Sequence, residues 1–311
     1  MENRWYVGAD VGGTTIKLGI YDTQANDFCK KWEIPTNTEN NGESIVSDLV
    51  FSIKETCSDI GISYDEICGI GIDVPGPVND EGFVYECVNL GWKEVNLYEE
   101  LKAISGISNI VIGNDANVAA LGEMWRGDLG GCDSVVMVTL GTAVGGGVII
   151  NGKIHSGSKG AGGEIGHMTV NPDEPDTCGC GMHGCLEQYS SATGIARLAR
   201  QMMNLDKDSK ITAKDVTDAA KAGDEKAVQV FDTAMKYLGI ALSNVANVVD
   251  PQAFIIGGGV SKAGTMITDA VSTYYNMYSM KSLQGRKFFL AKLGNDAGIY
   301  GCIKLVLENR Q

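Results

Sequence analysis

Two spacings of apolar residues alternate along this chain. Residues 5–22 contain two apolar runs on either side of a short turn, a pattern typical of a β-hairpin. Residues 42–60 then place apolar side chains at helical spacing, and residues 67–74 form a largely apolar run that ends at a Pro-Gly-Pro turn, as a buried strand does. Helix and strand patterns continue to alternate, which favours an α/β fold with a mainly parallel sheet.

The second half of the chain repeats the layout of the first hairpin. Residues 135–154 again place two apolar runs about a Gly-Thr turn, and such an internal echo predicts two related domains. A length of 311 residues is sufficient for both. The remaining patterns predict a strand, turn and helix over 109–126, helices over 192–204, 211–223 and 225–249, a strand and glycine turn over 251–261, a strand over 287–292 and a helix over 299–308.

Composition and charge narrow the possible partners. The chain is 44% apolar and 21% charged, as in soluble globular proteins. Its formal net charge of -14 argues against a nucleic-acid or anionic-membrane surface, because such partners bind clustered Lys and Arg. No basic segment with an apolar stretch opens the chain and no run of 18 apolar residues follows, so we expect a cytoplasmic protein. Six of the nine cysteines are scattered through mostly apolar segments, which is typical of buried free thiols.

The other three cysteines lie in a short stretch behind a histidine. One histidine and three thiolates this close together can complete a tetrahedral zinc site. Because four protein ligands leave no open position, such a zinc ion is structural rather than catalytic. The predicted ligands are His167, Cys178, Cys180 and Cys185.

Glu164 and Glu187 stand just outside the two ends of this ligand set. A metal-bound loop fixes both, and fixed carboxylates accept paired hydrogen bonds from vicinal hydroxyl groups. His167 can bind metal through one ring nitrogen and donate a hydrogen bond through the other. The stretch therefore predicts a rigid wall for a ligand that carries hydroxyl groups.

Three glycine turns are candidates for binding phosphate or a nucleotide. Glycine leaves backbone N–H groups unshielded, threonine hydroxyls can also donate, and Asp10 at the end of the first strand can hold Mg²⁺ through water. A plain hairpin explains the first turn equally well, but the matching second turn favours the phosphate interpretation. The third turn, Gly257–Gly259, can accept a flat ring or a phosphate, or be a tight turn only. The other candidates are Gly12, Gly13, Thr14 and Thr15 in the first hairpin and Gly141 and Thr142 in the second.

Asp115 lies at the junction of the strand and helix expected over 109–126. Asn114 or Asp115 can simply cap the helix. Alternatively, a carboxylate at the carboxyl end of a strand points into a cleft and accepts a proton from a hydroxyl nucleophile. Position alone does not decide between these. Gly76 in the Pro-Gly-Pro turn can offer its backbone to a substrate, and Asn89 in an irregular stretch can cap, turn or bind.

Together these motifs resemble the ROK family of bacterial sugar kinases and repressors, and within it the glucokinases. The resemblance covers nearly the whole chain, and the cysteine pattern with its preceding histidine is the most specific part of it. The motifs are Asp10-x-Gly-Gly-Thr-x-Ile-Lys17, Pro75-Gly-Pro, Asn114-Asp-Ala-Asn117, Leu140-Gly-Thr, Gly163-Glu-Ile-Gly-His167, Cys-x-Cys-Gly-x-x-Gly-Cys-x-Glu187 and Gly257-Gly-Gly.

The resemblance implies a fold and an assembly. The fold is the two-domain α/β type of actin and hexokinase, which is ribonuclease H-like, and the protein is a homodimer. We place the first domain at residues 1–115 with the terminal helix 299–311, and the second at residues 116–298.

The resemblance also implies ATP-dependent phosphorylation of a hexose, with glucose as the substrate and its 6-hydroxyl as the acceptor. Asp115 is then the general base, and structural Zn²⁺ joins ATP and Mg²⁺ as cofactors. The implied sugar-binding residues are Asn114, Glu164, His167, Glu187, Gly76 and Asn89. The implied cofactor-binding residues are Asp10, Gly12, Gly13, Thr14, Thr15, Lys17, Gly141, Thr142, Gly257, Gly258 and Gly259, with Asp10 organising Mg²⁺.

The chain departs from the family pattern at Ala143, where glycine is common in the second phosphate turn. A methyl group restricts positive φ, so we expect slightly altered nucleotide affinity. The helix-turn-helix of the family's repressors does not precede the first hairpin, which counts against binding DNA. The alternatives are an N-acetylmannosamine, fructose or other hexose kinase, or a non-catalytic sugar-sensing protein on the same fold.

Overall fold

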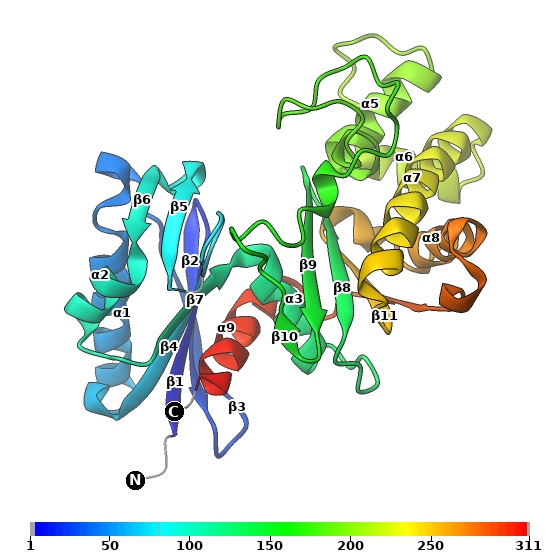
Figure 1. Ribbon diagram of the computed structural model, residues 1–311. Coiled ribbons are helices and arrows are strands. Elements are labelled where there is room, and N and C mark those ends of the chain that lie inside the picture. Colours follow the sequence, from blue (N-terminus) through cyan, green and yellow to red (C-terminus); the bar gives the residue numbers. More distant parts are fainter. Residues whose placement is uncertain (1–3, 80, 310–311) are drawn as a thin grey trace. The chain divides into compact units, whose positions relative to one another are not determined.

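Two five-stranded sheets organise the protein (Figure 1). The structure, a computed structural model, describes residues 4–79 and 81–309. One sheet belongs to a unit that contains the chain up to Asp128, the segment Ile154–Gly162 and the chain from Asn295 onward. The other sheet belongs to a unit made of Leu129–Lys153 and Gly163–Gly294.

The first sheet combines antiparallel and parallel strands. The strands of this unit are β1 (Trp5–Val11), β2 (Thr15–Asp22), β3 (Asp27–Pro35), β4 (Ile67–Val74), β5 (Phe83–Cys87), β6 (Trp92–Asn96) and β7 (Ile110–Asn114). The order in the sheet is β3-β2-β1-β4-β7, with β1, β4 and β7 parallel. The carboxyl ends of these three strands therefore lie at one edge of the sheet. Strands β5 and β6 form a separate pair.

Helices cover both faces of the first sheet. They are α1 (Ile45–Asp59), α2 (Leu97–Ser105), α3 (Asp115–Arg126) and α9 (Ala297–Glu308). Figure 1 shows α1 and α2 on one side of the sheet and α9 on the other. Because side chains alternate along a strand, Val7 and Ala9 join the core with α1 and α2, whereas Tyr6 packs with Ile303 and Val306 of α9. Burial of both faces explains the largely apolar sequences of β1 and β4.

Helix α3 approaches α9 closely through glycines. A Cβ atom on Gly122 would lie 2.1 Å from the backbone oxygen of Ala297, and one on Gly301 would lie 1.9 Å from that of Val118. These glycines permit an approach that any larger residue would prevent. The contact fixes α3 to the first unit.

The domain boundaries in the structure differ from those expected. The expected first domain ended at residue 115 and resumed at residue 299, whereas this unit extends to Asp128, includes Ile154–Gly162 and resumes at Asn295. The sequence predicts a helix after residue 115 but carries no signal that this helix packs on the C-terminal one. The boundary therefore falls after α3 and not before it.

The second sheet has the same arrangement as the first. Its strands are β8 (Val135–Leu140), β9 (Val144–Ile150), β10 (Lys153–Ile154), β11 (Ala253–Gly257) and β12 (Lys287–Leu290). The order is β10-β9-β8-β11-β12, in which β8 and β9 form the antiparallel hairpin and β11 is parallel to both β8 and β12. The similarity that the two hairpins show in the sequence thus extends to the parallel strands beside them.

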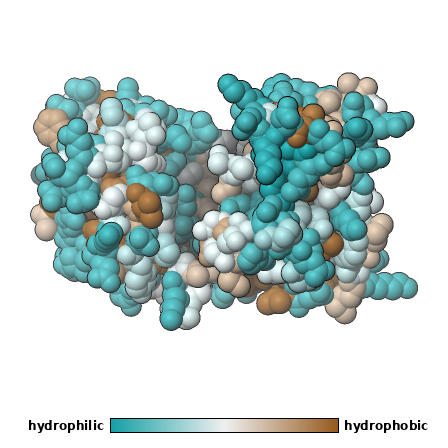
Figure 2. Space-filling view, turned by 90° about the horizontal axis from the view of Figure 1, so that it is seen from above, coloured by the Kyte–Doolittle hydropathy of each residue, from teal (hydrophilic) through white to brown (hydrophobic). Residues whose placement is uncertain are grey.

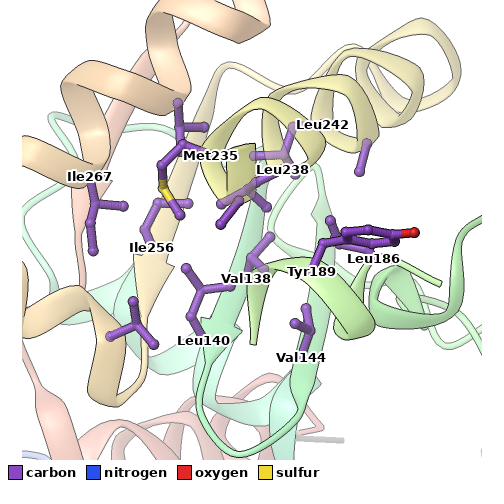
Figure 3. Packing of buried hydrophobic residues seen from close by; sticks show 14 of the residues in the cluster. Val138, Leu140, Val144, Leu186, Tyr189, Met235, Leu238, Leu242, Ile256 and Ile267 are labelled. Atoms are coloured by element: carbon purple, nitrogen blue, oxygen red, sulfur yellow. The ribbon is translucent and has the colours of Figure 1, made fainter. Parts of the chain in front are cut away.

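The core of the second unit lies between its sheet and a long helix. The helices are α4 (Glu187–Ser190), α5 (Ala192–Met202), α6 (Ala213–Lys221), α7 (Glu225–Val249) and α8 (Thr265–Tyr278). Helix α7 begins after Asp224, whose side chain accepts a hydrogen bond from the Ala227 N–H at 2.8 Å. Figure 3 shows Leu238 of α7 packed with Val138 and Leu140 of β8. Leu186 and Tyr189 join the same cluster and so anchor the short helix α4.

The face of the protein seen in Figure 2 is largely polar. Figure 2 shows mainly hydrophilic residues on the face in view, with hydrophobic residues dispersed among them. Within residues 4–79 and 81–309, no helix combines the length and the apolar character that crossing a membrane requires.

Candidate functional site

The turn between β1 and β2 exposes its tip. The Gly12 N–H donates a hydrogen bond to the Thr15 carbonyl oxygen at 3.0 Å, which closes the turn. Gly13 and Thr14 are exposed between them. A Cβ atom on Gly13 would lie 3.2 Å from the backbone oxygen of Asn89. The structure thus brings the first predicted phosphate turn and Asn89 together.

Asn114 ends β7 and caps α3. Its Oδ1 accepts hydrogen bonds from the N–H groups of Ala116 at 3.1 Å and Asn117 at 3.2 Å. Its Nδ2 donates to the carbonyl oxygen of Gly76 at 3.2 Å and to Asp115 Oδ1 at 3.0 Å. Asp115 Oδ1 also accepts the Ala116 N–H at 2.8 Å. Asn114 therefore caps α3. The hydrogen bonds to Asp115 Oδ1 fix the orientation of this carboxylate at the carboxyl end of β7.

A further aspartate that sequence reasoning did not select lies beside these groups. Asp73 of β4 pairs in register with Asp10 of β1 and is fully buried. Its Oδ2 accepts a hydrogen bond from Cys302 Sγ at 3.3 Å. Burial, and then the charges of Asp10 and Asp115, raise the pKa of Asp73 well above its usual value, so the neutral acid is favoured. An aspartate within an otherwise apolar strand is the signal that could have identified it.

Asp10 itself is partly exposed and has a cationic neighbour. Lys17 Nζ lies 3.3 Å from Asp10 Oδ2, and the two residues are paired across the β1–β2 hairpin. The predicted cofactor-binding pair Asp10 and Lys17 is therefore brought together. A carboxylate oxygen is a ligand type that suits Mg²⁺, and it lies close to the turn that is predicted to bind phosphate.

Four predicted metal ligands converge in the second unit. The ligand atoms of His167, Cys178, Cys180 and Cys185 all lie within 4.8 Å of one another. Cys178 Sγ is 3.9 Å from His167 Nδ1, and the Sγ atoms of Cys180 and Cys185 are 3.6 Å apart. A tetrahedral site with zinc–sulfur bonds of about 2.3 Å places two sulfurs about 3.8 Å apart, so the cluster has the dimensions to hold zinc. Burial and the adjacent thiols raise the pKa of Cys185 to about 12, and a bound cation would offset that cost.

The two glutamates that flank this cluster have different surroundings. Glu187 begins α4, and its Oε2 accepts a hydrogen bond from the Val144 N–H at 3.1 Å. Its Oε1 lies 3.9 Å from Cys178 Sγ. Glu164 is exposed and precedes the short 3-10 helix Ile165–His167, in which the His167 N–H donates to the Glu164 carbonyl oxygen at 3.2 Å. Glu187 Oε1 and His167 Nδ1 thus each lie 3.9 Å from Cys178 Sγ.

The turn between β8 and β9 resembles the first one in its exposed tip. The Gly141 N–H donates to the Ala143 carbonyl oxygen at 3.0 Å, and Thr142 is exposed. Ala143 does not adopt a positive φ, so its methyl group causes no backbone strain in this turn. Gly258 does have a positive φ of 81°, and a Cβ atom there would lie 2.6 Å from the backbone of Leu140. The third glycine turn is therefore packed against the second.

The structure distributes the predicted residues over both units. The first unit holds Asp10, Gly12, Gly13, Thr14, Thr15, Lys17, Gly76, Asn89, Asn114 and Asp115. The second unit holds Gly141, Thr142, Glu164, His167, Cys178, Cys180, Cys185, Glu187, Gly257, Gly258 and Gly259.

Comparisons with known proteins agree on one family. The model of the ROK family matches residues 6–309. A glucokinase of Halalkalibacterium halodurans is 42% identical over 313 residues, which cover 97% of this chain and 94% of that protein. The crystal structure of a ROK hexokinase from Thermus thermophilus has a TM-score of 0.83 at 30% identity and covers 98% of each chain. That of a ROK glucokinase from Streptomyces griseus with glucose and AMPPNP has a TM-score of 0.73 at 31% identity, covering 98% of this chain and 99% of that one.

Proposed function

The chain belongs to the ROK family, and on this premise we propose that it is a glucokinase, which transfers the γ-phosphoryl group of ATP to the 6-hydroxyl of glucose. The likeness to glucokinases along nearly the whole chain carries the proposal. It spans both hairpin turns, the junction of Asn114 and Asp115, and the cysteine loop. An α/β fold of the actin and hexokinase type agrees with this activity.

Asp115 is the proposed general base. Its carboxylate accepts the proton of the sugar hydroxyl as the oxygen forms a bond to the γ-phosphorus and the bond to ADP breaks. The hydrogen bonds from Asn114 Nδ2 and the Ala116 N–H hold one carboxylate oxygen in place. Positioning of this kind supplies most of the help that a protein can give to phosphoryl transfer.

Asp10 would hold the Mg²⁺ that accompanies ATP. Bound Mg²⁺ neutralises charge that develops on the phosphate oxygens. The fit rests on the oxygen donor at the end of β1, beside the exposed turn of Gly13 and Thr14. The two hairpin turns, Gly12 to Thr15 and Gly141 with Thr142, would bind phosphate through hydroxyl groups and through backbone N–H groups other than those of Gly12 and Gly141, which close the turns, and Gly257–Gly259 would contact the adenosine. Lys17 would balance the charge of Asp10.

The sugar contacts follow from the family likeness. In the first unit, Asn114, Gly76 and Asn89 are the proposed residues, and the hydrogen bond from Asn114 to the Gly76 oxygen supports a shared role for the first two. In the second unit the proposed residues are Glu164, His167 and Glu187. His167 presents Nδ1 to the cysteines, so Nε2 is the nitrogen for a sugar hydroxyl.

The cysteine cluster is proposed to hold a structural zinc ion. All four ligand positions are supplied by His167, Cys178, Cys180 and Cys185, which leaves no place for a reacting group. The ion would fix the loop that carries His167 and the start of α4, and so the positions of the sugar-binding carboxylates.

We also propose a homodimer, on family likeness alone. The proposed location is the cytoplasm, with which the absence of disulfide bonds among the nine cysteines agrees; all nine lie within the described residues.

A coupled assay of ADP release tests the function. Glucose, mannose, fructose, N-acetylglucosamine and N-acetylmannosamine are supplied in turn at saturating ATP, with turnover of glucose expected to be fastest. A protein that turned over another sugar but not glucose would be a different hexose kinase of the family. Binding of glucose by calorimetry without any turnover would refute the kinase assignment itself.

A further inference from the structure

A cavity of about 380 Å³ lies beside α6, within the second unit. This volume is within the range of sites that bind small organic ligands. Small and apolar side chains form part of its wall, and charged and polar side chains form the rest. The apolar part comprises Ala192, Ala213, Val260 and Ala263, and the polar part comprises Thr212, Lys214, Thr217, Asp218, Lys221 and Lys262.

One end of this cavity adjoins the second phosphate turn. The Ala192 N–H donates to the Gly141 carbonyl oxygen at 2.8 Å, and Thr193 Oγ1 donates to the Thr142 carbonyl oxygen at 2.9 Å. Gly259, which also lines the cavity, follows the glycine that packs on Leu140. The other wall is α6. A nucleotide whose phosphates lie on the Gly141–Thr142 turn therefore places its nucleoside between Gly259 and α6.

Asp218 differs from every other residue that lines the cavity because it alone is a carboxylate. The ribose of a nucleotide carries two adjacent hydroxyl groups, and one carboxylate can accept a hydrogen bond from each. Lys214 Nζ lies 2.5 Å from Asp218 Oδ2, and both side chains are largely exposed to solvent. The three lysines that line the cavity offset the negative charge of the chain for an anionic ligand.

We propose that Asp218 binds the ribose hydroxyls of the phosphoryl donor, so that α6 selects a ribonucleotide. This inference rests on the proposed ATP-dependent activity, which it deepens by assigning the part of the donor that distinguishes ATP from a deoxynucleotide or inorganic polyphosphate. The competing explanation is that Lys214 and Asp218 form an ordinary ion pair on an exposed helix, spaced four residues apart.

The test compares nucleotides with and without ribose hydroxyls. For Asp218→Ala we expect the KM for ATP to rise about tenfold with kcat unchanged, since a hydrogen bond to a charged group is lost. The KM for 2′,3′-dideoxy-ATP should change by less than about twofold, because that nucleotide has no ribose hydroxyl that could hydrogen-bond to Asp218. Asp218→Asn, which keeps the side-chain volume, should show the same selectivity with a smaller effect on ATP.

A matched control removes an equivalent ion pair elsewhere. Lys304 and Glu308 are also spaced four residues apart, on α9, with Nζ 2.9 Å from Oε1. Glu308→Ala should leave the KM for both nucleotides unchanged. An equal rise for ATP and dideoxy-ATP in Asp218→Ala, or no rise for either, would overturn the inference.

Calorimetry with ADP and 2′,3′-dideoxy-ADP makes the same comparison without turnover. A wild-type protein that failed to phosphorylate glucose would count against the proposed function. In that case the two affinities, measured for the wild type and for Asp218→Ala, would still decide whether the carboxylate binds ribose.

Discussion

Replacing Glu174 by glutamine tests how the loop of residues 167–185, which carries the proposed zinc ligands, is fixed to the second unit. Glu174 lies in the loop between His167 and Cys178, and only 8% of it is exposed. Arg197 of α5 donates one hydrogen bond to each of its oxygens, at 3.0 and 2.9 Å. Tyr189, whose ring is part of the hydrophobic core, donates another. The substitution keeps the side-chain volume but removes the charge that these donors face.

The size of the effect follows from the pKa of Glu174. The Arg197 hydrogen bonds are the main reason why this pKa falls from its usual 4.5 to about 2. Each pKa unit corresponds to about 1.4 kcal/mol, so the ionised carboxylate contributes about 3 kcal/mol to the free energy of unfolding at neutral pH. Because the pKa is lower in the folded than in the unfolded state, this contribution is present above about pH 4.5 and is lost as the pH falls toward 2.

Urea unfolding of both proteins, at several pH values between about 7 and 3, measures the difference. Glu174→Gln should lower the free energy of unfolding by about 3 kcal/mol near neutral pH, and the gap should narrow only below about pH 4.5. Asp176→Asn is the matched control, because Arg197 also donates to that carboxylate at 3.0 Å but its side chain is 59% exposed. Asp176→Asn should lower the free energy of unfolding by less than about 1 kcal/mol. The reasoning would be refuted if Glu174→Gln lowered the free energy of unfolding no more than Asp176→Asn does, or if the difference between Glu174→Gln and the wild type did not change with pH.

Three other substitutions test the site. Asp115→Asn should lower kcat for glucose at least about 100-fold in the ADP-release assay, because the amide cannot take the proton; a near-normal kcat would exclude it as the base. Cys180→Ser should lower zinc content and glucose affinity together, as measured by metal analysis and calorimetry, and normal affinity without zinc would separate the two. Gly258→Ala should lower the free energy of unfolding by roughly 1–3 kcal/mol, because its φ is 81° and the Leu140 backbone is close; unchanged thermal unfolding would contradict this.

The sequence predicts the elements whose apolar spacing is strong. The helix expected over 225–249 has the bounds of α7, because a long buried face repeats its apolar positions over many turns. Strand β3 was not predicted. It lies at the edge of its sheet and is exposed at most positions, so burial leaves little pattern in its sequence. The contact between α3 and α9 was also missed, since the two helices are separated by more than half of the chain.

The same distinction applies to the site. The cluster of potential metal ligands could be predicted because all four residues lie within one stretch of 19 residues, from His167 to Cys185, and histidine with three cysteines is a ligand set that suits zinc. Asp73 was missed: the sequence shows only an aspartate within an apolar run, and its position beside Asp10 depends on the register between two strands that are far apart in the sequence. The cavity beside α6 is a similar case, since α5, α6 and the glycine turn after β11 line it together.

Glu187 connects features that the sequence presents separately. Its Oε2 accepts the N–H of Val144, the residue that directly follows the second predicted phosphate turn, while its Oε1 lies 3.9 Å from Sγ of the predicted metal ligand Cys178. Leu186, just before it, is fully buried in the core of the second unit. A shift of the loop of residues 167–185 must therefore change either the Val144 hydrogen bond or the packing of Leu186. The proposed zinc ion would therefore hold the second hairpin turn as well as Glu187, a proposed sugar-binding residue, although it would take no part in the reaction.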